Sequence, residues 1–188
     1  MGRWEPDAEG RFRAAAMALF VERGYEQTTV ADIAERAGLT ARTFFRYFTD
    51  KREVLFNGSE RLQQAMVDAL GNAPPKATAI GAVAAALDAA ADFLGDNRAF
   101  ARERSAVIAV TAELHERELI KLSTLSAALA EALRARGIAE PDASLAAATG
   151  IAVFRVAFAL WVGKSERRGL SEIMRASLGR LKILAASK

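Results

Sequence analysis

The chain of 188 residues contains no cysteine and a single histidine. Without cysteine, the protein has neither disulfide bonds nor thiolate-bound metals. The lone His115 does not form a metal site by itself, and the sequence shows no other cluster of metal ligands. A phosphate-binding loop and a nucleophile paired with a base are also missing. We therefore expect no metal, no cofactor and no enzymatic activity.

The sequence also lacks an apolar signal at its N-terminus, which reads MGRWEPDAEGRFR. Its longest apolar stretch, ASLAAATGIAVFRVAFALWVG, is long enough for a membrane span but carries Arg155 near its middle. A charge at that depth would be costly in lipid. We expect a buried helix of a soluble, cytoplasmic protein that has no membrane partner.

Proline is scarce, with four residues in the chain, and no alternating pattern of β-strands is present. Apolar residues recur instead at intervals of three and four, which is typical of helices. Thr29, Thr40 and Asp50 are expected to cap three of them, the last running to the region of Pro74. The remaining helices are expected at 7–23, 78–94, 97–116, 117–136, 142–163 and 169–186. The sequence predicts an all-α fold with a three-helix domain at 1–50 and a larger helical domain at 51–188.

The net charge of +3 and the sequence pI of about 9.5 permit a polyanionic partner. Residues 1–60 nevertheless contain nearly equal numbers of basic and acidic side chains. Any nucleic-acid binding by this part must therefore depend on a few locally placed cations.

Residues 38–51 read GLTARTFFRYFTDK and concentrate aromatic and cationic side chains in a short segment. Small Ala34 lies where two short helices must touch, and Gly38 supplies the turn between them. This is the spacing of a helix-turn-helix, in which the second helix enters a DNA major groove. Phe44 and Phe48, four residues apart, are expected to belong to the core.

The second helix carries the side chains that would meet DNA. Its first turn contains Thr40, Ala41, Arg42 and Thr43, and arginine donates two hydrogen bonds to guanine O6 and N7. Arg46, Tyr47 and Lys51 are placed for contact with the DNA backbone. Each residue alone is also compatible with a solvated surface or with a protein-contact patch.

Residues 12–58 resemble the N-terminal domain of TetR-family transcriptional regulators. The resemblance rests on LF-x-x-x-G-Y, T-T-V-x-x-I-A-x-x-A-G-L-T and T-F-F-x-Y-F in this order and spacing. It implies a homodimer that binds a pseudo-palindromic DNA operator, usually represses, and responds to a small-molecule effector. The positions that commonly touch DNA in the family hold Thr29, Arg42, Thr43, Tyr47 and Lys51. Phe45 replaces a frequent tyrosine and Ala31 a frequent basic residue, so two family contacts are absent.

The resemblance also assigns the helices near 142–163 and 169–186 to the dimer interface, and the first of them is apolar almost all round. The alternative is the core of a monomer. The candidate ligand-binding residues are Phe93, Phe100, Ile108, Thr111, His115, Phe154, Arg155 and Phe158. Most of these fit an ordinary core equally well. Arg155 either pairs with a carboxylate such as Asp92, Glu103 or Glu113, or reaches water, or serves as counter-ion for an acidic ligand.

The sequence therefore predicts a ligand-responsive repressor released from DNA by a small apolar or amphipathic effector. An activator of the same fold and a helical protein-interaction module are the alternatives. An enzyme with a pocket in the helical body is disfavoured because no catalytic group stands out.

Overall fold

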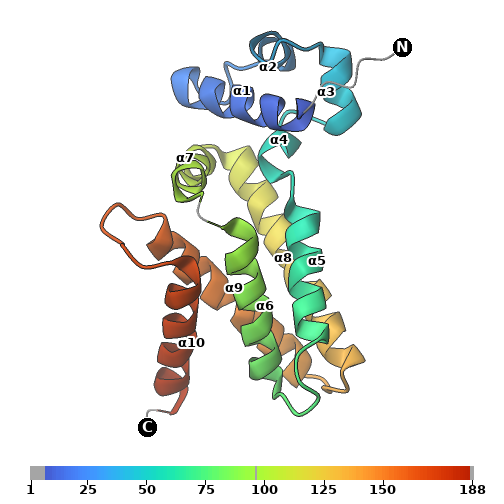
Figure 1. Cartoon of the computed structure of the whole chain (residues 1–188), viewed down its shortest axis with the longest axis vertical. Helices are drawn as coiled ribbons and strands as arrows, with labels where there is room; N and C mark the ends of the chain where they lie inside the picture. Colours follow the sequence, from blue (N-terminus) through green and yellow to red (C-terminus); the bar gives the residue numbers. More distant parts are fainter. Residues whose placement is uncertain (1–6, 96, 187–188) are drawn as a thin grey trace. The chain divides into compact units, whose positions relative to one another are not determined.

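A computed structural model describes residues 7–95 and 97–186 of the chain (Figure 1). Within these ranges the protein is entirely helical, which confirms the predicted fold class. The described helices are α1 (Ala8–Arg23), α2 (Val30–Arg36), α3 (Ala41–Tyr47), α4 (Glu53–Phe56), α5 (Ser59–Gly71), α6 (Ala79–Leu94), α7 (Arg98–Ala109), α8 (Ala112–Ala135), α9 (Asp142–Trp161) and α10 (Leu170–Ala186).

The chain divides into two compact units. Unit 1 contains residues up to Asn57 together with the segment Glu103–Glu118, and unit 2 contains Gly58–Arg102 and the residues from Leu119 onward. Helices α7 and α8 therefore each contribute to both units. The segment 103–118 brings the end of α7 and the start of α8 into the same unit as α1 to α4.

An aromatic cluster forms the centre of unit 1. Phe12 of α1 contacts Phe44 edge-on at 5.2 Å between ring centroids and Phe48 at 6.1 Å. Phe44 and Phe48 lie 5.0 Å apart, and all three rings are buried. Edge-to-face pairs add to the free energy gained from burial of the rings alone. The prediction that Phe44 and Phe48 belong to the core is confirmed.

Two predicted helix boundaries are wrong. The helix expected to run from Asp50 to Gly71 is divided into α4 and α5, because Asn57 leaves the helical conformation and Gly58 adopts a positive φ of 95°. The sequence predicted Asp50 as the cap of α4, but the N-cap position is Arg52. The Asp50 carboxylate accepts the N–H groups of Arg52 and Glu53 at 2.8 and 3.1 Å.

The second error concerns the boundary expected near residue 117. The break instead lies at Val110 and Thr111, between α7 and α8. The Thr111 N–H donates to Ile108 in a tight turn, and the Thr111 carbonyl accepts the first α8 bond from His115. Two consecutive β-branched residues have low helix propensity, which favours the break at this point.

The core of unit 2 is rich in alanine and contains residues of α5, α6, α8, α9 and α10. Helix α6 packs against α5, α9 and α10. Buried alanines at Ala82, Ala86 and Ala90 on α6 and at Ala143 and Ala147 on α9 allow the helices to approach closely.

Helix α9 is the only described helix that is long and apolar enough to cross a membrane, with a mean hydropathy of 1.8. Close to half of its most apolar window, 44%, is buried within the protein. The buried residues of α9 belong to the core of unit 2, and its remaining residues form part of the surface of that unit.

Candidate nucleic-acid interface

The turn between α2 and α3 is fixed by backbone hydrogen bonds and by one side chain. Gly38 has a φ of 65°, and the Leu39 N–H reaches back to the Ala34 carbonyl at 2.9 Å. Arg11 of α1 donates to the carbonyls of Ala37 and Gly38. These contacts satisfy carbonyls that the end of α2 would otherwise leave without partners. Sequence reasoning did not identify Arg11, because its partners are backbone atoms 26 and 27 residues away.

Threonine caps set the start of both helices, as the sequence predicted. Thr29 and Asp32 form a capping box, in which Thr29 Oγ accepts the Asp32 N–H at 3.1 Å and Asp32 accepts the Thr29 N–H at 2.8 Å. Thr40 Oγ accepts the Thr43 N–H at 3.1 Å. Hydrogen bonds from Thr29 hold the pKa of Asp32 below its usual value. The Asp32 carboxylate therefore remains charged beside the positive end of α2.

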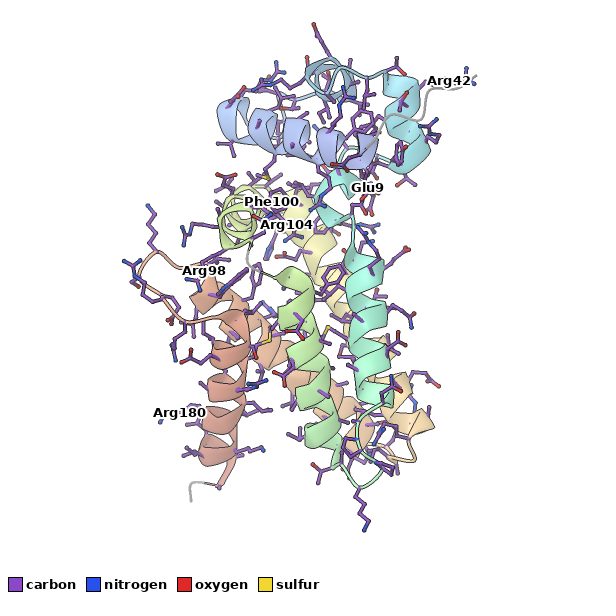
Figure 2. The ribbon with its side chains drawn as sticks, in the orientation of Figure 1. Glu9, Arg42, Arg98, Phe100, Arg104 and Arg180 are labelled. Atoms are coloured by element: carbon purple, nitrogen blue, oxygen red, sulfur yellow. The ribbon has the colours of Figure 1, made fainter. Side chains whose placement is uncertain are left out.

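Helix α3 has one buried and one exposed side. Phe44 is fully buried, whereas Phe45 is 57% exposed and Tyr47 is 41% exposed. Arg42 and Arg46 are also exposed, and Figure 2 shows Arg42 on α3. The Arg46 guanidinium lies 5.0 Å from the centre of the Tyr47 ring and donates to its hydroxyl at 3.1 Å. The two side chains therefore form an ordered cationic and aromatic pair on the surface.

The other predicted DNA-contacting residues lie at the ends of these helices. Thr29 and Thr40 are exposed, while Ala41 and Thr43 in the first turn of α3 are half-buried. The Thr40 and Thr43 hydroxyls are 2.9 Å apart, so they share one hydrogen bond and keep further capacity for a phosphate oxygen.

Lys51 has a structural contact that the sequence did not predict. Its Nζ donates to the carbonyls of Tyr25 and Thr28 at 2.8 and 2.9 Å, and lies 3.9 Å from the centre of the Tyr25 ring. An ammonium group has three donors, so one N–H is not used by these two bonds. Lys51 therefore fixes the loop before α2, and contact with DNA by its remaining N–H is a prediction.

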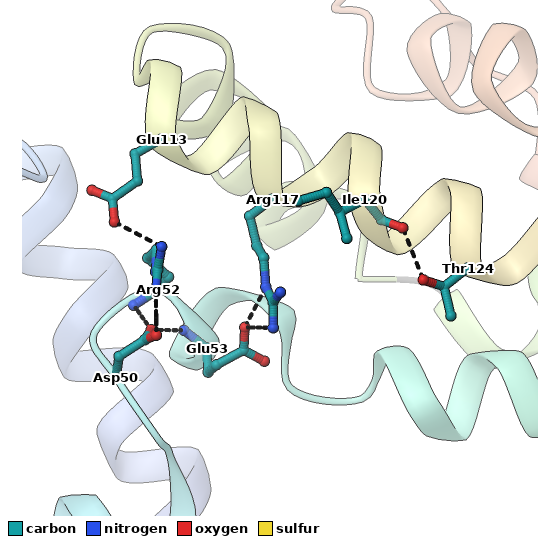
Figure 3. Close-up of polar contacts among 7 residues, drawn as sticks. All are labelled: Asp50, Arg52, Glu53, Glu113, Arg117, Ile120 and Thr124. Atoms are coloured by element: carbon teal, nitrogen blue, oxygen red, sulfur yellow. Dashed lines mark hydrogen bonds and ion pairs between the residues drawn. The ribbon is translucent and has the colours of Figure 1, made fainter.

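Ion pairs connect α4 to the segment 103–118 within unit 1 (Figure 3). Arg52 pairs with Asp50 at 2.7 Å and with Glu113 at 3.2 Å, and Arg117 pairs with Glu53 at 2.6 Å. The hydrogen bond from Arg52 lowers the pKa of Asp50. These pairs hold the start of α8 beside the helix that follows the DNA-binding motif.

Arg104, in the middle of α7, is the least exposed arginine among these ion pairs. Its Nε donates to the Leu55 carbonyl at 2.8 Å, and its Nη1 donates to Glu118 at 3.2 Å. The guanidinium also lies 5.0 Å from the centre of the Phe56 ring, and 19% of the side chain is exposed. Burial lowers the pKa of Arg104, whereas Glu118 raises it. Because its main partner is a backbone carbonyl on α4, nothing in the sequence pattern marks this arginine.

The structure separates the predicted ligand-binding residues. Ile108, Thr111 and His115 belong to unit 1, where the first two are buried and His115 is exposed. The others belong to unit 2, namely Phe93, Phe100, Phe154, Arg155 and Phe158. Of these, Phe154 and Phe158 stack with a centroid distance of 5.9 Å, while Phe93 is 41% exposed.

Arg155 points away from the core of unit 2. Its side chain is exposed and makes no hydrogen bond or ion pair with a described residue. An exposed guanidinium has no need of an internal counter-ion. The pairing of Arg155 with a ligand or with a second subunit stays a prediction.

Comparisons with known proteins agree with this geometry. Residues 12–57 match the model of the family described as "Bacterial regulatory proteins, tetR family". Over 55 residues the chain is 44% identical to the HTH-type transcriptional regulator TcmR of Streptomyces glaucescens. That match covers 29% of this chain and 24% of the TcmR sequence, so it spans about a quarter of that regulator.

Solved structures resemble the chain over nearly its whole length. A putative TetR-family regulator from Syntrophomonas wolfei has a TM-score of 0.65 at 18% identity, with 96% of each chain covered. FadR from Bacillus subtilis, solved in complex with stearoyl-CoA, has a TM-score of 0.60 at 24% identity, with 92% of this chain and 96% of that chain covered. At these identities the likeness establishes the fold.

The family also agrees with the expectation that the chain is not an enzyme, since its members are DNA-binding regulators. The motif at residues 12–57, the capped α2–turn–α3 geometry and the full-length fold all lead to one assignment. Residues 12–57 are therefore a DNA-binding domain of the TetR family, and the chain as a whole has the fold of TetR-family transcriptional regulators.

Proposed function

We propose that the protein is a homodimeric repressor that binds a pseudo-palindromic operator through α3 and dissociates when a small effector binds. The observation that carries this proposal is the division of α3 into two sides. Phe44 fixes the helix to the core of unit 1, and Arg42, Arg46 and Tyr47 are exposed on a helix whose N-terminus is capped by the side chain of Thr40.

The exposed residues have different tasks on DNA. Arg42, in the first turn, is placed for bidentate hydrogen bonds to a guanine edge. The Arg46–Tyr47 pair presents a cation and a hydroxyl, which suit phosphate oxygens. The α3 amides near Thr40 add the positive end of a helix. Phe45 has no polar atom to offer a phosphate, but its exposed ring is suited to contact with a thymine methyl group.

Dimerisation is supported by the exposed half of α9. Leu145, Val156 and Leu160 are 62%, 56% and 48% exposed, although they are large apolar residues. Exposed alanines at 148, 152 and 159 lie at helical intervals among them and continue the same stripe. On α10, Leu181, Ile183 and Leu184 are exposed as well. Contiguous apolar surface of this kind is typical of protein interfaces.

A dimer explains how a domain with little net charge binds DNA specifically. Two copies of α3 would occupy successive major grooves about 34–36 Å apart, which doubles the number of contacts. Repression follows if the bound dimer excludes polymerase from a promoter. The protein would act in the cytoplasm, where bacterial DNA is found.

The effector would bind in unit 2 and shift the population toward a conformation that fits DNA less well. The complex of Bacillus subtilis FadR with stearoyl-CoA supports an amphipathic effector for this fold. We propose that the effector of this chain is likewise small and partly apolar.

The decisive test is selection of duplexes from a random library by the purified protein, followed by titration of the best site across a salt series. We expect a pseudo-palindromic motif bound by a dimer, with log K falling linearly as log salt rises. The Arg42→Ala variant should lose both affinity and preference at one base pair of each half-site. If no motif is enriched and binding stays weak, the exposed aromatic side of α3 would be a protein-contact surface instead.

A further inference from the structure

Unit 2 contains a cavity of about 600 Å³ bounded by the end of α6, the start of α7, the end of α9 and the start of α10. A volume of several hundred Å³ is in the range of small-molecule sites. The cavity shares none of its lining with the ligand-binding residues that the sequence suggested. We propose that it binds a small molecule that carries a carboxylate group on an apolar body.

Arginine side chains fix the loop that forms one wall. Arg98 donates to the carbonyls of Glu166 and Arg168, and Arg102, one turn later on α7, donates to the carbonyl of Val162 at 2.7 Å. The Arg98 bond to Glu166 is 2.7 Å long. These charge-assisted hydrogen bonds hold the connection between α9 and α10 at three of its carbonyls and restrict its motion. The cavity is therefore preorganised before a ligand arrives.

Part of the cavity lining is apolar. Trp161 is 2% exposed, Leu170 is 4% exposed and Ala91 is 7% exposed, and all three belong to the lining. The Arg98 guanidinium lies 5.4 Å from the centre of the Trp161 ring. An apolar surface with a cation at its edge suits a molecule whose hydrocarbon part and anionic group are adjacent.

The charge of the described lining favours an anion. Arg98 and Arg167 face the cavity together with a single acidic residue, Asp92. The pKa of Arg175 is raised mainly by its hydrogen bond to Asp88 and, to a smaller extent, by the negative charge of Asp92. Arg167 is exposed, and its side chain makes no hydrogen bond with a described residue, so its donors are available to a carboxylate.

Polar groups at the start of α10 complete the anionic side. Ser171 lines the cavity, but its hydroxyl proton is donated to Asp88 at 3.1 Å, so a carboxylate ligand would be bound by the arginines and the backbone amides. The first amides of α10 add to the positive potential of the two arginines. An apolar alcohol of equal length would lose the charge-assisted bonds and bind more weakly.

Binding in this cavity does not depend on the proposed function, whereas an effect of that binding on DNA does. The experiment therefore measures the ligand alone. The chain has two tryptophans, so a Trp4→Phe variant of the full-length protein leaves Trp161 as the sole reporter. Titration of this variant with octanoate at constant ionic strength should give a saturable change in Trp161 emission. Octanol has the hydrocarbon chain without the anionic group, and inorganic phosphate is an anion without the hydrocarbon chain. Titrations with these two compounds therefore separate the two contributions to binding.

Two pairs of substitutions locate the site, each made in the Trp4→Phe protein. Arg167→Gln should weaken octanoate binding roughly tenfold or more, because a charge-assisted bond is lost. Lys164→Gln removes the same charge from the same loop outside the lining and should leave the affinity unchanged. Gly169→Leu places a bulky side chain in the lining and should weaken binding, and the fold should tolerate it because an added Cβ there meets no atom within 4 Å. Gly71→Leu, equally open and distant from the cavity, is its control.

Helical circular dichroism must be retained in each variant, and isothermal titration calorimetry gives the affinities independently of fluorescence. The proposal is overturned if octanoate gives no saturable signal by either method. It is overturned equally if octanol binds as tightly as octanoate, or if Lys164→Gln weakens binding as much as Arg167→Gln. A positive result without any change in DNA binding would establish the site and count against its role as the effector site.

Discussion

Lys51 Nζ lies 2.8 Å from the Tyr25 carbonyl oxygen and 3.9 Å from the centre of the Tyr25 ring. A residue whose position suggests phosphate binding is thereby also a structural element of the DNA-binding domain. This ammonium group also bonds the Thr28 carbonyl, and with the bond from the Thr28 hydroxyl to the Gly24 carbonyl it helps to hold the loop between α1 and α2. Thr29, which caps α2, follows directly in the chain.

Lys51→Met separates the two roles of this side chain. Loss of two charged hydrogen bonds to part-buried carbonyls should lower the free energy of unfolding by about 1–3 kcal/mol. If the remaining N–H also contacts a phosphate, the slope of log K against log salt should fall by about 1 per contact. Urea denaturation and a salt series on operator DNA measure these effects. Unchanged stability would contradict the structural role, and an unchanged slope would contradict the phosphate contact.

Arg42 and Arg46 should respond differently to replacement by alanine. We expect Arg42→Ala to cost about 1–3 kcal/mol of binding and to relax preference at one base position. Arg46→Ala should weaken binding to all sequences alike, since a phosphate contact carries no base information. Both side chains are exposed, so neither change should alter the fold. Selection experiments with both variants check this, and a loss of base preference in Arg46→Ala would reverse the two assignments.

Gly38→Ala should destabilise unit 1 by about 1–2 kcal/mol, because φ at this position is 65° and an L-residue is strained there. The new Cβ would also lie 2.8 Å from Arg11 Nη2 and displace the arginine that holds the turn. Gly71→Ala, where an added Cβ meets nothing within 4 Å, should be neutral or stabilising by up to about 1 kcal/mol. Chemical denaturation of both variants provides the comparison. If the Gly38→Ala and Gly71→Ala variants were equally stable, a side chain at position 38 would not strain the turn between α2 and α3.

Arg104→Met should lower stability by about 2–4 kcal/mol. The change leaves the Leu55 carbonyl without its 2.8 Å donor and Glu118 without its cation. Arg180→Met, at an exposed position on α10, controls for the loss of a positive charge and should change stability by less than about 0.5 kcal/mol. Thermal and urea unfolding of the two variants measure the effect. Similar losses of unfolding free energy in both would mean that Arg104 contributes nothing beyond its charge.

Leu160→Glu should convert the proposed dimer to a monomer, because a carboxylate within an apolar interface loses its hydration without gaining a partner. Val110→Glu is the matched control, since Val110 is 87% exposed and lies outside α9 and α10. Sedimentation velocity over a range of protein concentrations measures the association. If the Leu160→Glu variant remains a dimer, the interface lies elsewhere on the protein. If the wild-type protein is a monomer, the proposed interface is wrong.

Local patterns were sufficient to predict much of unit 1. The caps at Thr29 and Thr40 and the core positions of Phe44 and Phe48 depend on residues three or four apart, which the sequence displays directly. The break at Gly58 was missed because apolar periodicity continued through it, and the break at Thr111 was placed several residues too late. Periodicity alone does not mark where a helix must turn.

The sequence by itself determined the all-helical fold, the helix-turn-helix and the match of residues 12–57 to the TetR family, since each depends on the order and spacing of neighbouring side chains. Only the tertiary structure decided what the arginines and Lys51 do. Arg11, Arg104 and Lys51 each donate to backbone carbonyls far away in the chain, at Ala37, Leu55 and Tyr25. Every residue has a backbone carbonyl, so such a partner leaves no trace in the sequence. It becomes visible only when folding brings the two segments together.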